Sequence, residues 1–201
     1  MRFSKTEIRE LAIAWAVLGL CFSVDSLFNG VGRFLLAVGV SLIGVGTGFI
    51  VHEISHKLVA QRFGYWAEFR LWRIGLIIAF ASALLTMGRF LFAAPGAVHI
   101  LGYTRTREQG IISLSGPLSN LVIAGIFYLI SMVDYGDGWF SALVIMVCIY
   151  GFQINLWLAS FNLIPIQPLD GRAIMSWSMK VWILMVLFSW GTLALWFTGY
   201  I

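Results

Sequence analysis

Charged residues are scarce in this sequence: they make up 11% of the 201 residues, whereas hydrophobic residues make up 60%. Soluble domains are about a quarter charged and close to half apolar. With a mean hydropathy of +0.92, the chain is therefore predicted to be an all-α polytopic membrane protein. Its length suits a single integral-membrane domain over residues 1–201.

The sequence also lacks a basic patch and a set of paired cysteines. Its net charge is +4, but the basic residues are scattered between apolar runs, which argues against nucleic acid as a partner. Cys21 and Cys148 both lie within apolar runs, so a disulfide framework is not expected. The expected surroundings are instead the lipid bilayer of the cell membrane, and nothing in the sequence indicates an oligomeric state.

Long apolar runs predict the membrane spans, because a spanning helix needs about 20 mostly apolar residues. Such runs cover residues 8–28, 34–60, 111–133, 139–163 and 178–199. A sixth run, 74–94, contains Gly88 and Arg89 and ends in Ala-Pro-Gly, so it either crosses the membrane or enters and returns. The expected fold is a bundle of five to six transmembrane helices, with a small re-entrant or β-containing segment between the second and third full spans.

The basic residues favour the re-entrant alternative, because Lys and Arg collect in cytoplasmic loops. With a cytoplasmic N-terminus and a re-entrant 74–94, only Arg33 faces outward. The residues on the cytoplasmic side are then Arg2, Lys5, Arg9, Lys57, Arg62, Arg70, Arg73, Arg105, Arg107, Arg172 and Lys180. Full crossing would move the last four of these to the outer face. Non-helical backbone at membrane depth must line protein or a watery cavity, so a re-entrant segment also predicts a cavity.

Histidine is rare, with three in the chain, yet two of them stand in the segment HEISH at residues 52–56. On a helix, His52 and His56 lie on one face, one turn apart, where both can bind one metal ion. Glu53 can reach a water on that ion as a general base, the arrangement of H-E-x-x-H zinc hydrolases. The alternative is a set of packed polar residues. A charge at the centre of a span costs about 2.5–3.5 kcal/mol on insertion scales, which favours a functional role.

A catalytic zinc ion normally has three protein ligands, so a third is expected outside HEISH. Asp170 is the best candidate, within FNLIPIQPLDGR at residues 161–172. Pro165 and Pro168 end the preceding helix, and Gly171 permits a tight turn, so the aspartate is presented from irregular backbone near a span. The alternative is a proline-rich turn between two helices.

These segments together resemble the site-2 protease family of intramembrane zinc metalloproteases, in a compact prokaryotic form without PDZ or cystathionine-β-synthase domains. HEISH matches the H-E-x-x-H element of the family, NLIPIQPLDG at 162–171 matches its N-P-D-G element, and GPLSN at 116–120 matches a G-P-x-x-N element between them. PGAV at 95–98 also resembles a segment of the family. The segments occur in the family order over about residues 45–175, although Arg172 stands where a second glycine is usual.

The resemblance implies one Zn²⁺ per chain, bound by His52, His56 and Asp170, with Glu53 as the general base. It implies that Asn162 positions substrate or stabilises the oxyanion. Asn120 is a lesser candidate for such a role, or a polar tie between helices. The implied activity is cleavage of peptide bonds in or near transmembrane segments of membrane-protein substrates, in regulated intramembrane proteolysis.

Two other functions remain open from the sequence: a membrane zinc peptidase that acts on non-helical peptides, and a non-catalytic metal-binding membrane protein. Water is expected to enter from the cytoplasmic side, because HEISH lies just before Lys57 and Arg62. Residues 66–103 are expected to offer a strand edge to an unwound substrate. His99, within that region, has no partner at metal spacing and is expected to be an interfacial or packed residue.

Overall fold

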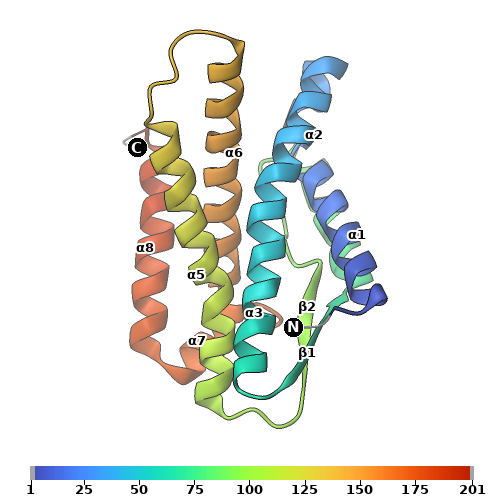
Figure 1. Ribbon diagram of the computed structural model, residues 1–201, viewed down its shortest axis with the longest axis vertical. Coiled ribbons are helices and arrows are strands. Elements are labelled where there is room, and N and C mark those ends of the chain that lie inside the picture. Colours follow the sequence, from blue (N-terminus) through green and yellow to red (C-terminus); the bar gives the residue numbers. More distant parts are fainter. Residues whose placement is uncertain (1–2, 200–201) are drawn as a thin grey trace.

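The computed structural model describes residues 3–199. It is largely helical, with one two-stranded sheet near one end of a helical bundle (Figure 1). The elements are α1 (Lys5–Cys21), the 3₁₀ helix η1 (Val24–Asn29), α2 (Val31–Val45), the π-helical turn η2 (Gly46–Ile50), α3 (Val51–Arg62), β1 (Trp66–Leu71), α4 (Arg73–Leu85), β2 (Gly96–Leu101), α5 (Thr106–Ser131), α6 (Trp139–Asn162), α7 (Asp170–Trp177) and α8 (Met179–Phe197).

Four helices between residues 3 and 199 are long and apolar enough to cross a membrane. They are Val31–Arg62, which joins α2, η2 and α3, followed by α5, α6 and α8. The predicted count of five to six spans is therefore not confirmed. The run at 8–28 forms α1, which has 17 residues and at 1.5 Å per residue is about 26 Å long, short of a hydrocarbon core of about 30 Å.

The residues that flank the ambiguous run at 74–94 lie side by side, at one end of the bundle. It forms α4, of 13 residues, followed by a turn and an extended return. The Trp72 N–H donates to the Pro95 carbonyl at 2.8 Å, and the flanking strands β1 and β2 pair antiparallel, with Leu71 opposite Gly96. The segment therefore returns to the end of the bundle that it left, as the distribution of basic residues predicts.

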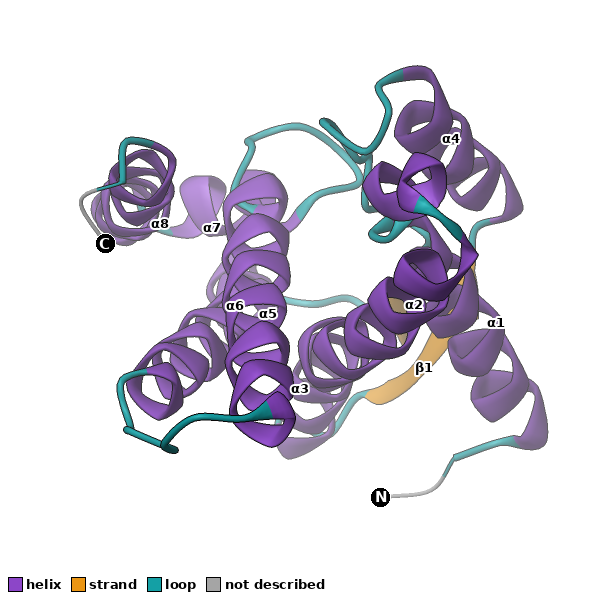
Figure 2. Ribbon diagram, turned by 90° about the horizontal axis from the view of Figure 1, so that it is seen from above, coloured by secondary structure: helices purple, strands orange, loops and turns teal. Residues whose placement is uncertain are grey.

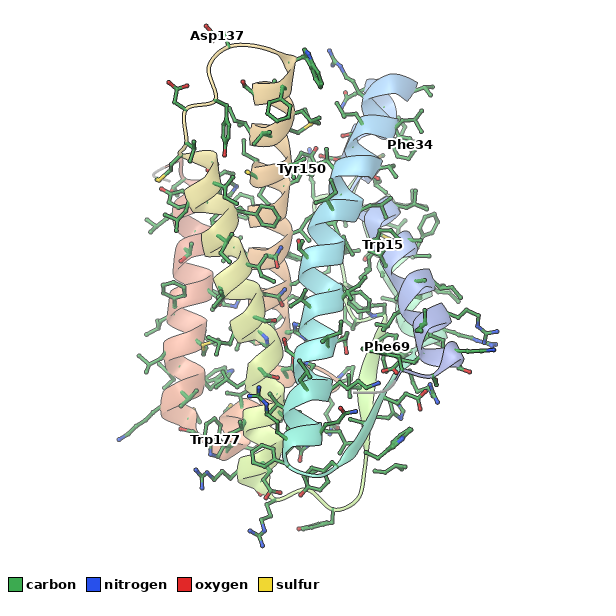
Figure 3. The ribbon with its side chains drawn as sticks, viewed as in Figure 1. Trp15, Phe34, Phe69, Asp137, Tyr150 and Trp177 are labelled. Atoms are coloured by element: carbon green, nitrogen blue, oxygen red, sulfur yellow. The ribbon has the colours of Figure 1, made fainter. Side chains whose placement is uncertain are left out.

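The sheet lies between the N-terminal helix and the long α2–α3 helix. Seen from above, β1 runs between α1 and α3, while α8 lies on the opposite side of the molecule from α4 (Figure 2). Phe69 of β1 is buried and packs edge-on against Phe49 of η2 at 5.6 Å between ring centroids; Figure 3 labels it beside α2–α3. This contact joins the sheet to the helix that carries HEISH.

Glycines let the central helices approach closely. A Cβ at Gly44 of α2 would lie 2.7 Å from Ile154 Cδ1 and 3.5 Å from Gly151 Cα, both on α6. This is helix packing through small residues of the kind found in membrane bundles. Cys21 and Cys148 are both buried and free, so the expectation of unpaired thiols is confirmed.

Candidate metal centre

Helix α3 presents both histidines of HEISH to one side. Their ring centroids lie 4.5 Å apart and the ring planes are perpendicular, and both side chains are buried. The π-helical turn η2 comes immediately before this segment. Such turns inside longer helices occur frequently at functional sites. The i, i+4 spacing of His52 and His56 thus brings the two rings together on one face of the helix, as predicted.

Asp170 joins this pair from a different part of the chain. Helix α6 ends at Asn162, residues 163–169 form turns, and α7 begins with Asp170. Its Oδ2 atom lies 3.2 Å from Nε2 of His52 and 3.2 Å from Nε2 of His56. The predicted break in the helix therefore brings the aspartate to the histidines.

The three side chains fit a zinc ion. Their ligand atoms all lie within 4.8 Å of one another. Tetrahedral ligands at 2.0–2.1 Å from zinc lie about 3.3 Å apart, close to the two observed 3.2 Å separations. Two imidazoles and a carboxylate are also a donor set that zinc accepts, with room for a fourth ligand.

Hydrogen bonds to the far side of each ring fix its orientation. Nδ1 of His52 lies 2.6 Å from Oδ1 of Asn120, and Nδ1 of His56 lies 2.8 Å from the carbonyl oxygen of Ile112. Both partners are oxygen atoms that accept a hydrogen bond, so each Nδ1 carries the hydrogen and each Nε2 is left free for a metal. Asn120 in turn donates to the Gly48 carbonyl and to Oδ1 of Asn155, each at 3.1 Å.

The glycine of the GPLSN segment, Gly116 in α5, lies directly against the two imidazole rings. A Cβ at Gly116 would lie 2.5 Å from Nε2 of His56 and 2.6 Å from Nε2 of His52, so no larger residue fits. Pro117 follows within the helix and has no N–H, which leaves the carbonyl of Ser113 without its helical donor. Ser113 lines the cavity beside the histidines.

Glu53 and Asn162 face the same space as the metal-binding group. Glu53 is 7% exposed, and its Oε2 atom is buried without a hydrogen-bond partner among the described residues. Such an atom is costly unless it meets water or substrate. Asn162 lines the same cavity, and its amide nitrogen donates to the Leu158 carbonyl one turn earlier, at 2.9 Å. Its amide has a second N–H and an oxygen that remain available to the site.

Two of the cavities that adjoin the centre share several lining residues. One of about 160 Å³ is lined by the three candidate ligands, Glu53, Asn162 and residues of β2. A second of about 540 Å³ lies between α5 and α7 and shares Gln109, Ser113, Pro168 and Asp170 with the first. Its other lining residues are mainly polar, among them Thr106, Gln167 and Ser176. The centre therefore connects to a polar space near the end of the bundle where α5 begins.

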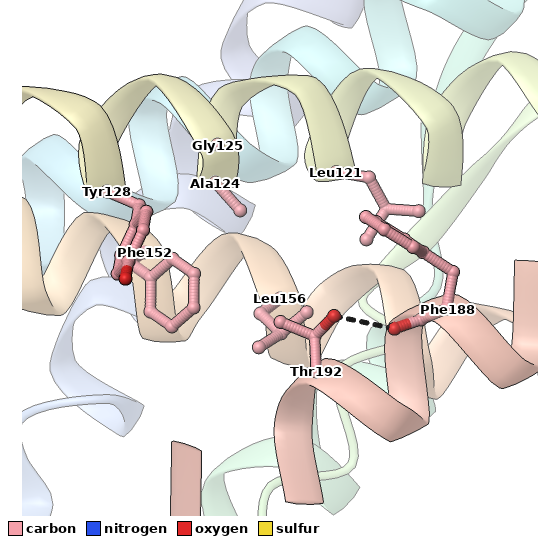
Figure 4. Close-up of a pocket in the computed structure, with 8 residues that line it drawn as sticks. All are labelled: Leu121, Ala124, Gly125, Tyr128, Phe152, Leu156, Phe188 and Thr192. Carbon is pink, nitrogen blue, oxygen red and sulfur yellow. Dashed lines mark hydrogen bonds between the residues drawn. The ribbon is translucent and has the colours of Figure 1, made fainter. Parts of the chain in front are cut away.

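A further crevice, between α5, α6 and α8, is of a different kind (Figure 4). It is lined mostly by apolar side chains, and the hydroxyl of Thr192 is already bonded to the Phe188 carbonyl at 2.7 Å. None of the candidate ligands borders it. The candidate site is therefore the cavity beside His52 and His56 and not this crevice.

Asp170 lies outside the four candidate spans, and its surroundings keep it ionised. Burial tends to raise the pKa of its carboxyl group, but the neighbouring His56 and His52 lower the pKa well below its ordinary value. An ionised carboxylate is the form that binds a metal.

His99 stands apart from this group. It is exposed on β2, opposite Glu68 in the strand register, and the cluster of candidate ligands found in residues 3–199 does not include it.

The supporting roles of Ile112 and Asn155 had no sequence signal, because one acts through its backbone carbonyl and the other is a single polar residue in an apolar helix. Asn120 was indicated only through the GPLSN segment.

Comparison with known proteins gives named relatives. The chain is 39% identical over 182 residues to "Putative zinc metalloprotease MJ0611" of Methanocaldococcus jannaschii, covering 90% of this chain and 89% of that protein. It is 32% identical over 145 residues to "Putative zinc metalloprotease YwhC" of Bacillus subtilis, 63% of each chain. It is 26% identical over 165 residues to "Zinc metalloprotease MJ0392" of M. jannaschii, 80% of this chain and 39% of that protein. No family model and no solved structure matches.

The similarity to the first relative extends over nine-tenths of both chains. It includes the region in which α3, α5 and α7 bring two histidines and an aspartate together beside four apolar helices. The chain belongs to the site-2 protease family of membrane zinc metalloproteases.

Proposed function

We propose that the protein is an intramembrane endopeptidase of the H-E-x-x-H type that cuts transmembrane segments of other membrane proteins. The observation that carries the proposal is the unpartnered Oε2 of Glu53, in the same cavity as His52, His56 and Asp170. A transport or structural metal site needs ligands but no free base beside the first of them. The position of this cavity among helices that are apolar enough to cross a membrane supports a substrate that is itself in the membrane.

In the proposed mechanism, His52, His56 and Asp170 would hold one zinc ion, which would supply Lewis-acid activation of water and of the scissile carbonyl. Glu53 takes the proton of the attacking water at its free Oε2 atom. It then passes that proton to the leaving amine. The Asn162 side chain lines the same cavity, and its proposed role is to orient the substrate carbonyl or to stabilise its developing negative charge.

The outer edge of β2 supports binding of an unwound substrate strand. On the other side of the sheet, the N–H groups of Phe69 and Leu71 in β1 donate to side chains of α1 and so point away from β2. Their partners in the register, Val98 and Gly96, are therefore in non-hydrogen-bonded pairs and direct their own N–H and C=O groups away from β1. Both residues line the cavity of the metal centre.

A strand added at this edge would place its backbone next to Glu53 and the candidate ligands. A transmembrane helix has its backbone amides paired internally, so it must unwind before attack, and pairing with β2 compensates the exposed groups. The polar cavity between α5 and α7 is the proposed route for water.

That route opens at the end of the bundle where most basic residues gather. Arg62 ends α3, Arg70 lies in β1, Arg105 precedes α5 and Arg172 lies in α7, whereas Arg33 lies at the start of α2, at the opposite end (Figure 1). The positive-inside tendency supports a cytoplasmic location for the basic end, for the water entry and for the N-terminus, in the cell membrane.

Glu53→Gln tests the proposal. The amide keeps the size of the side chain but cannot accept the proton, so the purified variant should keep one zinc ion per chain and lose cleavage of a transmembrane reporter in liposomes. Glu108→Gln, at a residue that lines neither cavity beside the metal-binding group, is the control and should cleave normally. Cleavage by Glu53→Gln at the wild-type rate would overturn the mechanism. If the wild type cuts only loose peptides and never a membrane-embedded helix, the substrate class is that of a different membrane zinc peptidase.

A further inference from the structure

Glu7 is a buried acidic residue that the proposed mechanism does not use. It lies in the first turn of α1 and is 1% exposed. Its Oε2 atom is 2.5 Å from Nζ of Lys57 on α3, and its Oε1 atom accepts the N–H of Phe69 on β1 at 3.0 Å. One carboxylate thus joins the metal-binding helix to the sheet.

Lys57 is equally enclosed and directly follows His56. It is 2% exposed, and its ammonium group lies 4.2 Å from the centre of the Phe3 ring. A buried ion pair contributes little to stability compared with apolar residues of the same size, because both charges lose their hydration. The best-attested use of such pairs is to fix one register among several.

Glu10 makes the same kind of contact to β1 as Glu7 but has no contact to Lys57, so a comparison of the two glutamates isolates the role of the ion pair. It lies one turn after Glu7, and its Oε2 accepts the N–H of Leu71 at 3.0 Å. Both glutamates therefore cover the outer edge of β1, which prevents a further strand from adding there. Only Glu7 also reaches α3, so the two residues share the edge contact and differ in the contact to the metal-binding helix.

We propose that Glu7 is a positioning residue that sets the register between the metal centre and the strand edge that binds substrate. The link runs from His56 to its neighbour Lys57, through the Glu7 carboxylate to Phe69, and across the sheet to Val98, which lines the catalytic cavity. A fixed distance between the β2 edge and Glu53 determines which peptide bond of a bound strand faces the base. The inference rests on the proposed function, because it needs a substrate strand on β2.

Glu7→Gln separates the two contacts of the carboxylate. The amide oxygen still accepts the Phe69 N–H, but the amide nitrogen faces the Lys57 ammonium group, and two donors cannot pair. We expect the zinc content to be unchanged. We also expect cleavage of a transmembrane reporter to spread from one bond to neighbouring bonds, with kcat/KM at least tenfold lower. Lys57→Met should give the same spread, whereas Lys57→Arg, which keeps the pair, should cut at the wild-type bond.

Glu10→Gln is the matched control, with an edge contact but no ion pair, and should keep the wild-type cleavage site and rate. The cut positions are read by mass spectrometry of the products, which a loss of stability alone would not change. A single wild-type cut in Glu7→Gln, or an equal spread in Glu10→Gln, would overturn the inference. Failure of the wild type to cut the reporter at all would instead overturn the proposed function.

Discussion

Asn120 is expected to control zinc affinity without touching the metal. It is fully buried, and its Oδ1 atom is 2.6 Å from Nδ1 of His52, which makes it the group that holds this ring with Nε2 free. Loss of such a partner typically weakens metal binding 10–100-fold. That range corresponds to about 1.4–2.7 kcal/mol of binding free energy.

Two substitutions distinguish this role from packing. Asn120→Ala removes the acceptor for His52 and also the donor to Oδ1 of Asn155, whereas the Gly48 carbonyl keeps the N–H of Val51. Each buried polar group that loses its partner costs about 1–3 kcal/mol, so the fold is destabilised as well. Asn120→Asp keeps an acceptor for His52, in the carboxylate–histidine–zinc arrangement, and loses only the donor.

The assay is competition for zinc between the purified protein and a chelator of known affinity, together with thermal unfolding of the zinc-free protein. Both variants should unfold at lower temperature, but zinc affinity should fall 10–100-fold in Asn120→Ala and remain closer to wild type in Asn120→Asp. Equal losses of affinity in the two variants, or none in Asn120→Ala, would refute the argument from His52 Nδ1.

Three further outcomes are expected. Gly116→Ala should abolish zinc binding because its Cβ would lie 2.5 Å from the His56 ring, whereas Gly125→Ala, on the same helix beside open space (Figure 4), should bind zinc normally in the same competition assay. Gly171→Ala should weaken zinc binding and lower the unfolding temperature, because its Cβ would collide with the Leu163 carbonyl and displace α7; normal affinity would show that the turn can adjust. Removal of zinc by a chelator should stop cleavage, and added Zn²⁺ should restore it; cleavage that persists in metal-free protein would contradict the metalloprotease mechanism.

Much of the fold is readable from the sequence because membrane spans obey simple rules. The four long helices follow from apolar length, and the return of residues 74–94 follows from the placement of arginine and lysine. The number of spans is harder to predict from the sequence. The run at 8–28 is apolar enough, yet α1 ends at Cys21 and a 3₁₀ helix follows, a boundary that hydrophobicity alone does not mark.

The sequence by itself determined which groups could bind a metal, because the i, i+4 spacing of His52 and His56 fixes them on one helical face and Pro165 and Pro168 force a break before Asp170. Only the tertiary structure decided what surrounds them. The bonds from His56 to the Ile112 carbonyl, from His52 to Asn120 and from Lys57 to Glu7 join residues 50–68 positions apart, and no local pattern encodes such contacts. They arise when helices pack, because a buried polar group must find whichever partner the fold brings within reach.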